Sequence, residues 1–199
     1  MVEMLVNAYP RHIHEYQSFY ILDYLHHLLV LFPSLALQVT NSKFIPYLLE
    51  TAGPTNLHHP MHESTIIAFI ESTLKYLDSA LKQHLIEEIT KIQPFNQFFT
   101  IKLVEMLINF DIDSSQLLVF AYKGYFDRLL EVISREEEEG IRKRAVEQYL
   151  KVVEKVSTIN EATSAFLLFK LRTKVQHLNN TQLMNLVASS KIQNHLNLI

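Results

Sequence analysis

The chain has 199 residues, with 18 Lys plus Arg against 21 Asp plus Glu, so its formal net charge at pH 7 is −3. It has three glycines and no cysteine. So little glycine argues against β-rich folds and glycine-loop nucleotide sites, which need positive φ. The absence of cysteine excludes disulfides, thiol catalysis and thiolate metal sites. The charge balance gives no general attraction to nucleic acid.

Prolines and polar clusters divide the sequence into about nine helical segments. Apolar residues recur at steps of three and four from residue 11 to 32, where Pro33 follows. We expect Ser42 to cap a short helix, Pro60 to occupy a first helical position, Gly124 to bend or break a helix, and Asn160 to cap another. No strand pattern is convincing. The expected helices span residues 11–32, 42–50, 60–79, 81–92, 95–110, 114–134, 135–157, 161–178 and 180–199.

Successive helix starts pair into hairpins of about 40 residues, a period typical of two-helix repeats. In this period and helical pattern the chain resembles HEAT or armadillo repeats, which implies an all-α solenoid of antiparallel hairpins. A compact helical bundle is the alternative. We expect one helical domain over residues 1–199, with the loop near 51–60 as a boundary between layers. The last segment stays apolar to its end, which predicts either a fragment of a larger solenoid or an end that packs on another subunit.

A histidine cluster is the sharpest candidate for a metal site. His58, His59 and His62 are followed by Glu63, and these residue types are zinc ligands. However, Pro60 starts a helix between the histidines, and the HExxH order is missing. Packing and capping at a helix start is the interpretation we favour, with no cofactor; a small metal-dependent enzyme is the alternative.

The strongest charge feature is the run from Arg135 to Arg144, REEEEGIRKR. In the pairs Glu138–Arg142 and Glu139–Lys143, the acidic residue lies four positions before the basic residue, and this order stabilises a helix. One interpretation is a solvated helix start. The other is a binding patch in which Arg142, Lys143 and Arg144 meet an acidic partner surface.

Histidines and aromatic residues outside these motifs have a structural interpretation. We expect one of His26 and His27 to face the core and the other solvent. Two aromatic groups are expected to form core between helical layers. They are Phe95, Phe98 and Phe99, and Tyr122, Tyr125 and Phe126.

The sequence as a whole predicts a non-enzymatic scaffold or adaptor that binds other proteins, possible membership of a multi-subunit complex, and no nucleic-acid partner. We expect an intracellular, cytoplasmic or organelle-associated protein without a transmembrane segment. The stretch HHPMHESTIIAFIESTLKYL, followed by PFNQFF, is similar in layout to helical portions of the fungal intraperoxisomal import peroxin. That resemblance implies a role in docking import receptors to membrane-bound peroxins.

Overall fold

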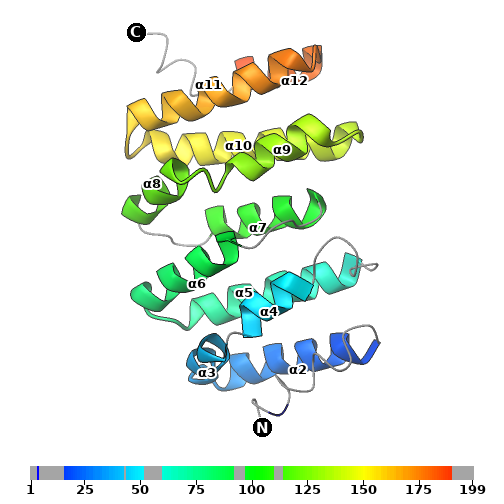
Figure 1. The fold of residues 1–199 in the computed structure, drawn as a ribbon, viewed down its shortest axis with the longest axis vertical. Helices are drawn as coiled ribbons and strands as arrows, with labels where there is room; N and C mark the ends of the chain where they lie inside the picture. The colour runs from blue at the N-terminus through cyan, green and yellow to red at the C-terminus, as the bar shows by residue number, and fades with distance from the viewer. Residues whose placement is uncertain are drawn as a thin grey trace. The chain divides into compact units, whose positions relative to one another are not determined.

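The structure is a computed structural model, and it describes residues 4, 16–42, 44–51, 60–91, 97–109 and 114–189. Over these residues the protein is all-helical and contains no strand (Figure 1). The chain divides into two compact units, Met1–Asn96 and Gln97–Ile199, which are described separately. No helix in the described part is long and apolar enough to cross a lipid bilayer.

Unit 1 is built around the packing of α2 against α5. Its described helices are α2 (Tyr16–Leu31), α3 (Leu35–Asn41), α4 (Phe44–Thr51), α5 (Pro60–Lys75) and α6 (Ser79–Lys91). Leu22, Leu25 and Leu29 of α2 are buried, and α4 packs against α3 and α6. Phe44 and Phe69 meet edge to face, with ring centroids 5.7 Å apart. Burial of these apolar faces is the main force holding unit 1 together.

The two histidines of α2 have different surroundings. The Nδ1 atom of His26 lies 3.1 Å from the hydroxyl of Ser72 on α5, so this ring contributes to the α2–α5 contact. The ring of His27 is exposed, and its Nδ1 lies 2.8 Å from the backbone oxygen of Asp23. The prediction that one ring faces solvent is confirmed for His27, whereas His26 is only partly buried at the α2–α5 contact and does not lie in the core.

Unit 2 is arranged around its longest helix, α10. Its described helices are α7 (Gln97–Asn109), α8 (Ser114–Tyr122), α9 (Asp127–Arg135), α10 (Glu139–Ser157), α11 (Glu161–His177) and α12 (Thr181–Ala188). α10 packs against α7 and α12, and also against α9 and α11, which contact each other. The core contains Tyr149, Val152 and Val153 of α10, all fully buried.

The described residues form eleven helices, so the expectation of about nine was too low. One additional helix is α3, which begins at Leu35, two residues after Pro33; the Leu35 and Ala36 N–H groups donate to the carbonyl oxygens of Phe32 and Pro33 in the turn before it. The other arises because the expected helix 114–134 is two helices, α8 and α9. Gly124 has φ +74° and ends α8 with Tyr125 N–H bonded to Phe120 O, a Schellman arrangement that favours glycine.

Side-chain caps set the starts of α11 and α12, whereas two other expected helix starts are wrong. Asn160 and Asn180 each accept a hydrogen bond from the backbone N–H three residues later, and they begin α11 and α12 as expected. Ser42 was expected to start a helix, but its hydroxyl donates to Val39 O and so serves the end of α3. The expected helix start at Arg135 is also wrong, because α9 continues to Arg135 and α10 begins at Glu139.

Three predicted features fall wholly or partly outside the described residues. The proposed layer boundary near 51–60 is described only at its two ends, Thr51 in α4 and Pro60 in α5. The apolar end of the chain lies outside the described part beyond Ser189. The side chains of Phe95, Phe98 and Phe99 also lie outside it.

Candidate functional site

The surface of unit 2 carries three large aromatic side chains that the core does not cover. Tyr122 at the end of α8 is 71% exposed, and Phe166 and Phe169 on α11 are 55% and 66% exposed. By contrast, Phe120 and Phe126 are buried. Leaving such side chains in water forgoes roughly 1.5–3 kcal/mol each. We call Tyr122, Phe166 and Phe169 the aromatic face.

The sequence of α11 explains why two phenylalanines face outward. Residues 166–169 read Phe-Leu-Leu-Phe, and four consecutive residues at about 100° each span most of the helix circumference. Leu167 and Leu168 are buried, together with Leu171 one turn later. The phenylalanines at either end of the run therefore lie on the opposite, exposed side of α11.

A hydrogen-bonded chain at the start of α11 holds Tyr122. The side-chain oxygen of Asn160 accepts from the N–H of Thr163 at 2.8 Å. The Thr163 hydroxyl oxygen lies 2.9 Å from Asn160 Oδ1 and 2.8 Å from the Tyr122 hydroxyl. Because an amide oxygen can only accept, the Thr163 proton goes to Asn160 and the Tyr122 proton to Thr163. The helix cap thus also orients the exposed tyrosine.

A second set of contacts holds Phe166. The ammonium of Lys170 on α11 donates to Asp127 Oδ2 at 2.7 Å, at the first residue of α9. The same Lys170 Nζ lies 5.0 Å from the centroid of the Phe166 ring, within the range of a cation–π interaction. Gly124 leaves room for the carboxylate, since a Cβ at that position would lie 3.1 Å from Asp127 Oδ2. Phe166 is therefore exposed, and the Lys170 ammonium holds its ring on one side.

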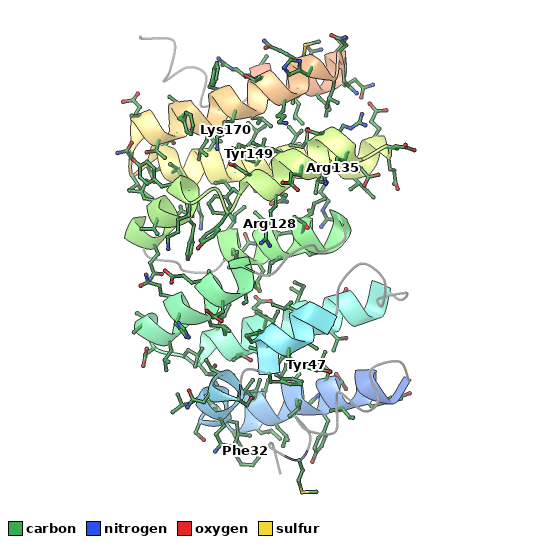
Figure 2. All side chains as sticks on the ribbon, viewed as in Figure 1. Phe32, Tyr47, Arg128, Arg135, Tyr149 and Lys170 are labelled. Atoms are coloured by element: carbon green, nitrogen blue, oxygen red, sulfur yellow. The ribbon has the colours of Figure 1, made fainter. Side chains whose placement is uncertain are left out.

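A buried polar centre lies beneath this ion pair. Tyr149 comes from α10 and Lys170 from the neighbouring α11 (Figure 2). Neither the Tyr149 hydroxyl nor Asp127 Oδ1 has a hydrogen-bond partner among the described residues. Burial, and secondly the negative charge of Asp127, raises the pKa of the Tyr149 phenol well above its ordinary value. The phenol therefore stays protonated at neutral pH, which does not suit a general base.

The three predicted binding residues of α10 have different surroundings. The guanidinium of Arg142 donates to the backbone oxygen of Glu136, Lys143 is exposed, and Arg144 pairs with Glu105 of α7 at 3.0 Å. Partial burial would raise the pKa of Glu105, but the Arg144 hydrogen bond and the charges of Lys102 and Arg144 outweigh it and lower that pKa. Two of the three cations are thus engaged within unit 2.

The expected helix-stabilising pairs of the charge run do not form. In the span 114–189, neither Glu138 and Arg142 nor Glu139 and Lys143 make an ion pair. Glu138 precedes α10 in an extended conformation, which removes the helical spacing of the first pair. The side chain of Glu136 instead accepts from the N–H groups of the next two residues.

The histidine cluster lies almost wholly outside the described part. His58 and His59 are outside it, and His62 and Glu63 are described only as backbone of α5. Among the side chains that the structure describes, no group of three or more His, Cys, Asp or Glu residues could hold a metal ion. The metal hypothesis therefore stays a prediction.

Unit 1 has an exposed apolar stripe of its own. Tyr24 and Leu31 of α2 are exposed, and Phe32 follows at the helix end, where Figure 2 labels it. Asp23 is the one charged residue between positions 16 and 42, so this stripe has little electrostatic character. We use it below as a matched reference for the aromatic face.

Most of the aromatic face was not predicted from the sequence. Tyr122 was expected in the core and is exposed; Phe126 from the same group is buried, and Tyr125 is partly covered. Phe166 and Phe169 were not singled out. The available signal was the run of four apolar residues within one helix, because such a run cannot be buried on a single face.

No protein-family model, curated protein or solved structure matches this chain significantly. Function must therefore be inferred from the residues and their arrangement.

Proposed function

We propose that this protein is a non-enzymatic scaffold or adaptor, built from paired antiparallel helices, that binds other proteins through its aromatic face. The observation that carries the proposal is that Tyr122, Phe166 and Phe169 are exposed while internal contacts hold the first two in place. Aromatic side chains fixed before binding lose little conformational entropy on association, and they are frequent hot spots of protein interfaces.

The order of helix contacts supports a repeat architecture of the HEAT or armadillo kind. In unit 2, α7, α10 and α12 form one series of contacts and α9 and α11 form another. The α9–α10 and α11–α12 hairpins join the two series, together with the extensive α10–α11 contact. Stacked two-helix repeats produce this alternation, because each helix contacts its own hairpin partner and its equivalent in the next repeat. A compact bundle is the competing arrangement.

We also propose that the protein acts inside the cell, and the absence of cysteine is compatible with a reducing environment. Membership of a multi-subunit complex follows naturally from the proposed role. Binding of protein partners at α11 needs neither a cofactor nor a reactive group.

Affinity capture with matched surface variants tests the proposal. The test variant is Phe166→Ser with Phe169→Ser, and the control is Tyr24→Ser with Leu31→Ser, which removes two exposed apolar side chains from unit 1. Both should keep the wild-type circular dichroism spectrum and melting temperature, because the altered residues are exposed.

We expect quantitative mass spectrometry to find at least one protein that wild type and control retain and the test variant loses by about tenfold or more. Equal recovery of every protein by all three forms would show that the aromatic face is not the binding surface.

A further inference from the structure

We propose that the occupant of the aromatic face is an acidic amphipathic helix of a partner protein. This inference rests on the proposed function and adds the charge and shape of the partner. It follows from the charges around Phe166 and Phe169, from their spacing along α11, and from the small residues beside them.

After its first residue, Glu161, α11 carries only positive charge. Lys170, Arg172 and Lys174 follow, and the chain has no Asp or Glu from residue 162 to 189. Asp127 neutralises part of this charge through its ion pair with Lys170, whereas Lys174 is exposed. At about 100° per residue, Lys170 and Arg172 lie on opposite sides of the phenylalanine pair. An apolar strip with cations on both flanks complements a helix with an apolar face and acidic flanks.

The same charges argue against self-association through this face. A second copy would bring another set of Lys170, Arg172 and Lys174 to the same interface, and gathering like charges at one interface is unfavourable. The uncharged residues of the face are suited to close approach by a helix, since Ala162 and Thr173 lie one turn before Phe166 and one turn after Phe169. A partner helix could then place its apolar residues around the two rings.

An anionic membrane surface is less favourable than an acidic helix. Surface binding by basic segments usually requires roughly four to eight clustered Lys or Arg, whereas α11 has three, and Asp127 neutralises Lys170 among them.

Fluorescence anisotropy with two designed peptides tests the inference on the full chain. The first is an amphipathic helix of about 18 residues with leucines on one face and glutamates on its flanks. The second is identical except that lysines replace the glutamates. We expect the acidic peptide to bind at least about tenfold more tightly and to weaken several-fold as salt rises from about 0.05 to 0.3 M.

Variants locate the binding. Phe166→Ser with Phe169→Ser should abolish acidic-peptide binding, and Lys174→Glu should weaken it by about threefold. Lys151→Glu, the same reversal at an exposed lysine of α10, should leave it unchanged. Sedimentation with phosphatidylcholine vesicles, with and without phosphatidylserine, should show no binding to either.

Three outcomes would overturn the inference: equal or tighter binding of the lysine peptide, no binding of either peptide up to about 1 mM, or binding to phosphatidylserine vesicles that depends on Phe166 and Phe169. If capture still detects a partner that the test variant loses, the proposed function stands and only the acidic helix is wrong. If capture also shows no difference, the proposed function fails as well.

Discussion

Removal of the Tyr149 hydroxyl tests the buried polar centre of unit 2. The side chain is 0% exposed, and its hydroxyl has no hydrogen-bond partner among the described residues. Moving a hydroxyl out of water without a new hydrogen bond costs about 1–3 kcal/mol. Because Tyr149→Phe keeps the ring and its packing, we expect the free energy of unfolding to rise by about 1 kcal/mol at pH 7. The melting temperature should rise by about 2–4 °C.

The same substitution should change the response to alkaline pH. Burial, and then the charge of Asp127, raises the pKa of Tyr149 in the folded protein, while the unfolded chain titrates near the ordinary value of about 10. Ionisation of Tyr149 in the unfolded chain therefore leaves the free energy of unfolding unchanged below about pH 10. Above that pH it lowers the free energy of unfolding by about 1.4 kcal/mol per pH unit. Tyr149→Phe removes that loss, so its advantage over wild type should grow between about pH 10 and 11.

Urea unfolding followed by circular dichroism at about pH 7, 10 and 11 measures both effects. Tyr24→Phe, at an exposed tyrosine of α2, is the control and should match wild type at each pH. A loss of more than about 1 kcal/mol at pH 7 for Tyr149→Phe would mean that the hydroxyl has a partner in the folded protein. An unchanged difference above pH 10 would mean that it ionises in place. Either result refutes the reasoning.

Four further predictions concern stability. Asn160→Ala should lower the free energy of unfolding by about 1 kcal/mol through loss of the α11 cap, measured by urea unfolding. Gly124→Ala should lower the free energy of unfolding by about 1–2 kcal/mol, because φ at this position is +74° and the new Cβ would crowd the Asp127 carboxylate. An unchanged melting temperature would show that alanine is not strained at this position. Leu25→Ala should cost about 2–5 kcal/mol in chemical denaturation, whereas Tyr24→Ser on the exposed side of α2 should stay within about 0.5. Glu105→Gln should make the free energy of unfolding less sensitive to acid. The pKa of Glu105 is lowered in the folded protein, so its carboxylate stabilises the fold above about pH 4.3. This stabilisation, about 0.5 kcal/mol in all, is lost as the pH falls. Parallel acid titrations of variant and wild type would show no difference if the pair with Arg144 is unimportant.

Local signals predicted most helix positions correctly. Pro60 begins α5, and the side chains of Asn160 and Asn180 cap α11 and α12, because capping depends on residues three or four positions apart. Gly124 was recognised as a possible break for the same reason: positive φ is a property of the residue and its immediate neighbours.

The candidate site was much harder to predict, because it depends on contacts between distant segments. Tyr122 is oriented by Thr163, and Lys170 is paired with Asp127, over 40 positions away in each case. The prominent basic run at Arg142 is largely occupied by internal partners instead. Neither result can be read from spacing, since the sequence does not say which helices become neighbours.

The amino-acid sequence by itself determined that this protein is helical and where most of its helices begin, because hydrophobic period, prolines and caps act over a few residues. Only the tertiary structure decided which apolar side chains are covered. Phe166 and Leu167 are adjacent and equally suited to a core, yet one is exposed and the other is buried. The difference arises because the packing of α11 against α10 and α9 covers one side of the helix and leaves the other in water.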